Sequence, residues 1–433
     1  MKKLLIVVAV SILFSLLYIR GIGLGNTYED PFIIPAISNI CGEESKAWRI
    51  PYSVNLPKVS LIPGADITDK QKRDDTLIVF LQRKADDLSW RSFIALNWPA
   101  DKKGFADSSK CFATSSNEQS VWEYWMPSTE IYVDKGDKVQ KWKSGRLFWS
   151  SRPKNGGKES EMRILGKSTN MTTTNAEEFP VIDKNKRYTL FEIFYNRVAY
   201  EYVTEMGLNT IEGQKKYTTE WPDYNSGLTY IVNDDTVNIQ ERFKRAYFPV
   251  GSIKDSTPPP NGEEQYIFKT GEGAIIVKSA WMILDDSDYP AKYHTREVKL
   301  PTGEKYMLGL VAMHIAHKVV EATQWTWASF EHIDNAPQIG ADGYAVLHPG
   351  KDYTYFDEKD NHPADYNKPP KPPFQAKRSE RKSSQVVTLT QIEKGTQKIN
   401  GEYHQMIREA NPNSLWLNYR LVGTQWPFDP RLF

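Results

Sequence analysis

Three histidines and a glutamate stand close together in Tyr306–Pro337, and their side chains could bind a metal ion or transfer protons. Imidazole and carboxylate groups suit zinc and non-haem iron, provided that three of them converge on one ion. The candidate metal ligands are His314, His317, Glu331 and His332. His314 and Glu331 are also catalytic candidates, because both side chains can take up and release a proton.

A third catalytic candidate, Glu123, lies in the aromatic run Val121–Trp125. A carboxyl group among tryptophans can have a raised pKa and act as a general acid. The alternative is an ion-paired or solvent-facing position on a strand. Glu123 and Glu331 together also suggest glycan processing. That chemistry needs two carboxylates across a cleft, about 5–5.5 Å apart in retaining enzymes or about 6.5–9.5 Å apart in inverting enzymes. The 13 tryptophans could stack on sugars, but aromatic residues also favour β-strands in general.

The elements that must position the histidines are predicted as a β-hairpin of Leu308–Val320 and Trp325–Ile333, joined by four residues. Placing Val320 opposite Trp325 puts His314 opposite Glu331. Alternation along each strand then separates two faces. One carries His314 and Glu331, and the other carries His317 and His332 together with Val311, Met313, Ile315 and Phe330.

This separation argues against one site that uses all four candidate ligands. A helical alternative for Met307–Val320 stays open, because the connecting loop has no glycine or asparagine. On a helix, His314 and His317 would share a face and could bind a metal together.

Other segments complete an α+β prediction, with a mostly antiparallel β-sheet core, a few packed helices and long surface loops. Thr189–Gly207 is predicted as the clearest helix. Thr189 and Glu192 form a capping box, a stripe from Leu190 repeats every four residues, and Gly207 follows the last turn. That stripe is expected to pack on the sheet. Further helices are predicted over Asp86–Trp98 and Asn400–Ala410, and further strands over Ala274–Leu284, with Lys278 at the sheet rim, and Leu415–Trp426.

The N-terminus has the layout of a targeting segment. Lys2 and Lys3 precede the apolar run Leu4–Ile19, which ends at Arg20. Residues 1–25 are predicted to be a signal peptide or an N-terminal membrane anchor. Residues 26–433 are predicted to form a single extracytoplasmic body, periplasmic or secreted. It has a candidate sub-boundary at 256–264 and a proline-rich surface strap at 361–384.

Charge and cysteine content narrow the function classes. The net charge of +1 and the absence of a basic stripe give no support for nucleic-acid binding, and membrane contact is expected only through the N-terminal anchor. Cys41 and Cys111 are the two cysteines. In an oxidising compartment they would form one disulfide, and two buried thiols are the alternative.

Six stretches in order resemble a family of secreted bacterial proteins labelled cytochrome c family proteins. They are Trp90–Pro99 (WRSFIALNWP), Val121–Trp125, Asn196–Val203, Gly273–Leu284, Leu308–Pro337 and Tyr419–Pro427. The label in that family rests on a haem-attachment motif beyond the Gln-Trp-Pro element, here Gln425–Pro427. This sequence contains no C-x-x-C-H motif, so the resemblance implies a shared fold and compartment without a covalent c-type haem.

Three functions follow as hypotheses. The first is a non-catalytic or accessory extracytoplasmic protein, built on the body of that family, with a protein or small-molecule partner that the sequence does not identify. The second is a metal-dependent enzyme that uses the central histidines and glutamate. The third is a carbohydrate-binding or carbohydrate-processing protein.

Overall fold

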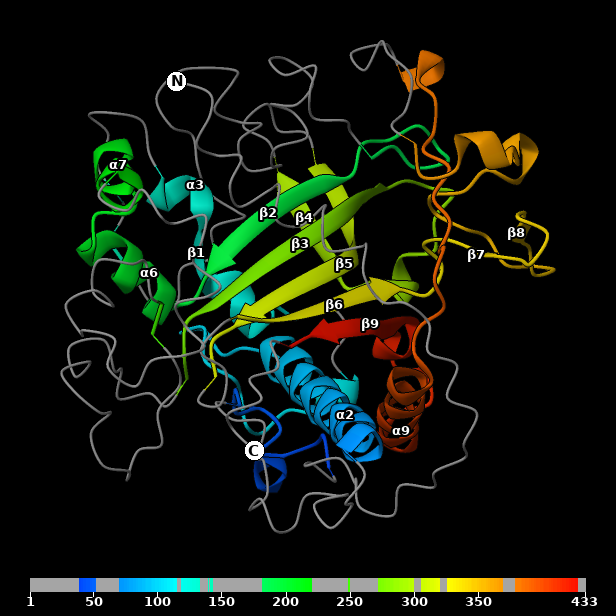
Figure 1. The fold of residues 1–433 in the computed structure, drawn as a ribbon. Coiled ribbons are helices and arrows are strands. Elements are labelled where there is room, and N and C mark those ends of the chain that lie inside the picture. Colours follow the sequence, from blue (N-terminus) through cyan, green and yellow to red (C-terminus); the bar gives the residue numbers. More distant parts are fainter. Residues whose placement is uncertain are drawn as a thin grey trace.

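An antiparallel sheet runs through the computed structural model of the chain (Figure 1). The structure describes residues 39–51, 70–114, 118–132, 139, 141–142, 181–219, 248–249, 272–299, 305–319, 325–368 and 378–426. In this part of the chain the sheet has 7 strands in the order β1-β2-β3-β5-β6-β9, with β4 also paired to β5. All pairs are antiparallel, which confirms the predicted α+β class with a mostly antiparallel core.

The strands of this sheet are β1 (Met126–Pro127), β2 (Leu190–Tyr195), β3 (Ile275–Leu284), β4 (Thr295–Lys299), β5 (Lys305–His317), β6 (Thr326–His332) and β9 (Tyr419–Gln425). A small separate sheet pairs β7 (Gln338–Ile339) with β8 (Ala345–Val346). The α-helices are α2 (Lys70–Leu96), α3 (Ser128–Ile131), α6 (Arg197–Glu205), α7 (Ile211–Thr219) and α9 (Lys394–Ala410). Short 3₁₀ helices are η1 (Glu43–Ser45), η3 (Phe112–Thr114), η4 (Val121–Tyr124), η7 (Pro290–Lys292), η8 (Glu358–Asp360), η9 (Pro363–Asp365), η10 (Arg378–Glu380) and η11 (Leu415–Asn418).

One face of the sheet, which we call the core face, packs against α2 and α9 (Figure 1). Phe93 of α2 stacks on Phe330 of β6 with ring centroids 4.1 Å apart. Trp90 stacks on Tyr403 of α9 at 5.0 Å and donates a 2.9 Å hydrogen bond to Asn400. These buried aromatic contacts hold the two helices on the sheet, because each ring removes a large apolar area from water.

Two of the predicted helices are present and extend further toward the N-terminus. α2 begins at Lys70, well before Asp86, because no proline interrupts the chain from there to Pro99. It ends at Leu96, and the Asn97 side chain donates a 2.9 Å hydrogen bond to the carbonyl of Phe93. α9 likewise begins at Lys394 and ends at Ala410.

The prediction of a helix over Thr189–Gly207 is wrong in its first half. Leu190–Tyr195 is strand β2, and Asn196 caps the helix α6 that follows, since its side chain accepts a hydrogen bond from Ala199 N. A spacing of four residues is also an even spacing, so Leu190 and Phe194 share one face of a strand as well. The predicted C′ glycine is confirmed, because Gly207 follows α6 with φ +65°.

The central hairpin is confirmed as β5 and β6, and the helical alternative for Met307–Val320 is wrong. The register differs by two residues from the predicted one: His314 lies opposite Ser329, and Glu331 lies opposite Ala312. Pairing stops at His317 and Thr326, so the connection is longer than four residues. A shift of two residues preserves both faces, which is why the separation of the histidines holds.

Val311 lies on the other side of the sheet from its predicted position. The pairing of β3 with β5 is irregular at Ala280–Trp281, and it passes from Ala312 to Leu310 without including Val311. This β-bulge reverses the alternation. Leu308 and Leu310 therefore join the core face, whereas Val311 packs with Met282 and Tyr355 on the opposite face, which we call the outer face.

Strand β3 confirms the prediction over Ala274–Leu284, starting one residue later. The predicted strand Leu415–Trp426 is partly right. Its first residues form η11, where the Ser414 side chain accepts from Trp416 N at 3.4 Å, and β9 starts at Tyr419.

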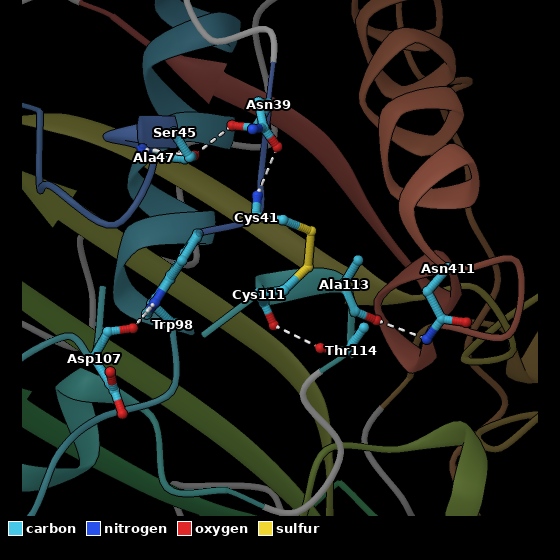
Figure 2. The surroundings of a disulfide bond; sticks show 10 residues. All are labelled: Asn39, Cys41, Ser45, Ala47, Trp98, Asp107, Cys111, Ala113, Thr114 and Asn411. Carbon is cyan, nitrogen blue, oxygen red and sulfur yellow. Dashed lines mark hydrogen bonds between the residues drawn. A yellow bond between two sulfur atoms is a disulfide. The ribbon is translucent and has the colours of Figure 1, made fainter. Parts of the chain in front are cut away.

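A disulfide joins Cys41 to Cys111 across a sequence separation of 70 residues (Figure 2). The Asn411 side chain at the end of α9 donates a 3.0 Å hydrogen bond to the carbonyl of Ala113 beside it. The disulfide therefore links the segment 39–51 to the loop that follows α2, and this loop lies next to the end of α9.

Several predictions fall wholly or partly outside the described residues. The leader 1–25 and the candidate boundary 256–264 lie outside them, as do residues 369–377 of the predicted strap. The described part of the strap contains η9 and Tyr366, which is buried against Phe356 at 5.8 Å between ring centroids. Among the described residues, no helix has both the length and the apolar character needed to cross a membrane.

Candidate functional site on the outer face

The sheet separates the four predicted metal ligands. His314 and Glu331 are on the outer face, whereas His317 and His332 are on the core face with Met313. Within the described ranges, no group of three or more His, Cys, Asp or Glu residues is placed to hold a metal ion.

Glu123 lies in η4 and not on a strand, and it is fully buried on the core-face side. Its carboxylate pairs with the Arg296 guanidinium of β4. Ser120 N donates a 2.6 Å hydrogen bond to Oε2, completing a capping box at the start of η4. The ion-paired alternative for this residue is therefore correct.

This ion pair is buried on both sides. Burial lowers the pKa of Arg296 to about 9, which leaves the guanidinium protonated at neutral pH. His294 Nε2 lies 3.5 Å from Glu123 Oε1, and burial lowers the His294 pKa to about 3. His294 is neutral, so Arg296 is the cation that balances Glu123 here.

Glu331 also has an arginine partner. Arg420 of β9, directly opposite on the adjacent strand, donates from Nε at 3.0 Å and from Nη2 at 2.8 Å to Glu331 Oε1. The two side chains are each 22% exposed. Because Glu331 is on the outer face and Glu123 is on the core-face side, the pair cannot flank one cleft as a glycosidase requires.

His332 has a structural environment. Its ring stacks on Tyr293 at 4.3 Å, Nδ1 accepts from Asp334 N at 3.2 Å, and Nε2 lies 3.2 Å from the Lys292 carbonyl oxygen. Burial lowers the His332 pKa to about 4, although the negative charge of Asp334 acts to raise it. Both ring nitrogens are occupied by the protein, as in a buried histidine that fixes a strand end.

His314 lies in a polar row across the middle of the outer face. Nδ1 forms a 2.8 Å hydrogen bond with Ser329 Oγ on β6, and Lys278 of β3 is the cross-strand partner on the other side. Burial, with a smaller effect of Lys278, lowers the His314 pKa to about 4. Lys278 lies within the predicted strand, where a paired position or one that extends to the sheet rim was expected, and its Nζ is 5.2 Å from the Phe191 ring centroid.

Small residues surround this row. Ala312 and Ala316 flank His314 along β5, and Gly423 of β9 lies opposite Ser329. A Cβ atom added to Gly423 would meet no atom of the described residues within 4 Å, so these residues leave the space above this position open. Trp327, two residues before Ser329 on the same face, is partly exposed. We call Lys278, His314, Ser329 and Trp327 the outer row.

Other parts of the chain cover the outer face on both sides of this row, along the direction of the strands. At one end, Tyr355 packs with Met282 and Val311. At the other end, α6 packs over Tyr195 and Ile276. The outer row lies between these two covers, and its polar side chains are half-buried. Its His314 and Ser329 side chains can offer hydrogen bonds to a ligand, and Trp327 can offer an aromatic ring.

The sequence did not predict the positions of two ionisable residues, Glu192 and Arg296. Glu192, predicted as part of a capping box, points to the core face between Leu190 and Phe194. There its Oε2 is buried and has no hydrogen-bond partner in the part of the chain that the structure describes. Burial raises the pKa of Glu192 well above the usual range. A lone acid in the aromatic strand LFEIFY was the signal for it. Arg296 was missed as the partner of Glu123, because 173 residues separate them.

No family model, no curated protein and no solved structure matches this chain.

Proposed function

We propose that this chain is a non-catalytic, extracytoplasmic accessory protein that binds its partner or ligand at the outer row. The observation that carries the proposal is the pairing of both candidate catalytic carboxylates with arginine, Glu123 with Arg296 and Glu331 with Arg420. In each pair the guanidinium already balances the carboxylate within the fold, which is what a structural ion pair provides.

The chemistry of His314 also supports binding over catalysis. A general base works best with a pKa near the working pH, and a pKa of about 4 makes this imidazole a weak base at pH 7. The same neutral ring is a good hydrogen-bonding group. Ser329 fixes its orientation, and its Nε2 forms no hydrogen bond with any residue that the structure describes.

The proposed compartment and the proposed family relationship are supported by the sequence and by the disulfide. The charged and apolar leader favours export, and the Cys41–Cys111 disulfide is of a kind that persists in oxidising compartments. The ordered resemblance to cytochrome c family proteins supports a shared body, and the missing C-x-x-C-H motif supports a protein without covalent haem.

The test is to express the full chain in a bacterium that attaches c-type haem, and to recover it from the periplasmic fraction. We expect a disulfide-bonded protein whose visible spectrum shows no haem after acid extraction, and whose metal content is well below one ion per chain. Covalent haem, stoichiometric metal, or retention in the cytoplasm would overturn the proposal.

A second candidate, carbohydrate binding, is favoured by the open space over Gly423 beside the partly exposed Trp327. A sugar ring could stack on the indole while its hydroxyls reach His314 and Ser329. This candidate concerns binding only, because Glu123 and Glu331 lie on opposite sides of the sheet.

Tryptophan fluorescence during titration with cellohexaose and chitohexaose tests this candidate. We expect Trp327→Ala to weaken binding about tenfold or more, since stacking and apolar burial of one indole contribute about 1.5–3 kcal/mol. Tyr344→Ala, an exposed aromatic in the turn between β7 and β8, is the matched control and should bind as the wild type does. Equal binding by Trp327→Ala, or no binding by the wild type, removes the candidate.

A further inference from the structure

Polar side chains gather on the core face where α2 crosses the ends of three strands. They are Ser89 and Ser92 of α2, His317 of β5, Thr326 of β6 and Thr424 of β9, and all five are buried. The Ser89 and Thr424 hydroxyls form a 2.7 Å hydrogen bond. Part of this polar group is therefore satisfied by contacts between helix and sheet.

Among the residues that the structure describes, two atoms of the group have no hydrogen-bond partner. These atoms, His317 Nε2 and Thr326 Oγ1, are sealed from solvent, and their residues are only 2% and 3% exposed. They lie on directly opposed residues of β5 and β6. Cross-strand partners have Cβ atoms about 4.5–5.5 Å apart and point to the same side of the sheet. The two side chains that carry the unpartnered atoms are therefore neighbours.

The imidazole is neutral and can form one more hydrogen bond. Burial, with a smaller effect of Arg91, lowers the His317 pKa to about 3. Nδ1 is already 3.4 Å from Ser92 Oγ. A neutral imidazole has one donor and one acceptor nitrogen, and a buried polar atom without a partner costs free energy. His317 Nε2 and Thr326 Oγ1 are each left with an unused hydrogen-bonding capacity, and one small group between the two side chains could use both.

We propose that one ordered water molecule binds between His317 Nε2 and Thr326 Oγ1 and links β5 and β6 beneath α2. A small neutral molecule that both donates and accepts is the ligand class that suits an imidazole nitrogen and a hydroxyl. Buried waters characteristically form about three hydrogen bonds to polar groups that the chain leaves unsatisfied. The proposal is independent of the function assigned to the outer row.

The test is a crystal structure of the full chain near 1.2 Å resolution, together with ¹⁵N NMR of the His317 ring. We expect one water peak within about 2.7–3.2 Å of both atoms. Thr326→Val keeps the side-chain shape and removes the hydroxyl, and it should lose the peak and shift the Nε2 resonance. Thr424→Val removes a hydroxyl that already bonds to Ser89, and it should keep both.

A direct hydrogen bond between His317 Nε2 and a protein atom, or a site without electron density, would overturn the proposal. So would an unchanged water peak in Thr326→Val, because the threonine hydroxyl would then not be its partner. The ¹⁵N shift of Nε2 reads the hydrogen bond directly, so a loss of stability in the variant cannot imitate the result.

Discussion

Breaking the buried ion pair between Glu123 and Arg296 should destabilise the protein far more than breaking its counterpart on the outer face. Glu123→Ala would leave the Arg296 guanidinium buried among apolar groups without its counter-charge. Removal of one partner of a buried pair costs about 3–5 kcal/mol. That is a large share of the roughly 5–15 kcal/mol by which a domain is stable.

The matched control is Glu331→Ala. It removes the same type of side chain from the same type of partner, but Glu331 and Arg420 are each 22% exposed, so water can take over part of the lost interaction. Pairs with access to solvent contribute about 0.2–1 kcal/mol. The two substitutions should therefore differ by at least about 2 kcal/mol, although both delete one arginine–glutamate pair.

Urea unfolding followed by tryptophan fluorescence measures both free energies of unfolding. The double variant Glu123→Leu with Arg296→Met gives a second comparison, because apolar replacement of a whole buried pair is often neutral or stabilising. A cost below about 1 kcal/mol for Glu123→Ala would refute the reasoning. So would a double variant as unstable as the sum of its single variants, since the cost would then come from lost packing and not from an unpaired charge.

Three further predictions follow from burial and covalent connectivity. Folding raises the pKa of Glu192, so the protonated side chain is compatible with the folded state and the charged side chain destabilises it as the pH rises. Glu192→Gln should therefore be more stable than the wild type at pH 7 and should lose that advantage near pH 4, as measured by urea unfolding. His294, His314, His317 and His332 have lowered pKa values of about 3 to 4, so stability should fall as pH drops from about 6.5, by up to about 1.4 kcal/mol per pH unit for each histidine, in acid titrations followed by circular dichroism. Cys41→Ser with Cys111→Ser opens a loop of 70 residues and should cost about 4 kcal/mol, seen as a lower Tm; an unchanged Tm would exclude this contribution.

The sequence predicted the hairpin better than the helices because strand alternation is a strong local signal. The faces of β5 and β6 were right for His314 with Glu331 and for His317 with His332, and the two-residue error in register did not disturb them. Leu190 and Phe194 show the limit of the same signal. Their spacing of four suits a helix face and a strand face equally, and only the pairing of β2 with β3 decides between them.

The candidate site was less accessible to prediction, because its decisive contacts are distant in the sequence. Glu123 meets Arg296 across 173 residues, and Glu331 meets Arg420 across 89. The bulge that moves Val311 to the outer face depends on the fit between β3 and β5 and leaves no mark in the residue types. The contact between His314 and Ser329 likewise depends on the observed register, because the predicted register places Glu331 opposite His314.

The two faces of the sheet use similar polar groups for different purposes, and burial decides which. On the core face, Glu123, His294, His317 and His332 are all buried, and His332 and His294 stack on Tyr293 and Trp416, so these polar groups belong to the packed interior. On the outer face, His314 and Ser329 stand beside an open position at Gly423. A polar pair costs desolvation wherever it is half-buried. Where small residues leave room above such a pair, a bound ligand can supply the missing contacts, and this makes the outer row the place to search for function.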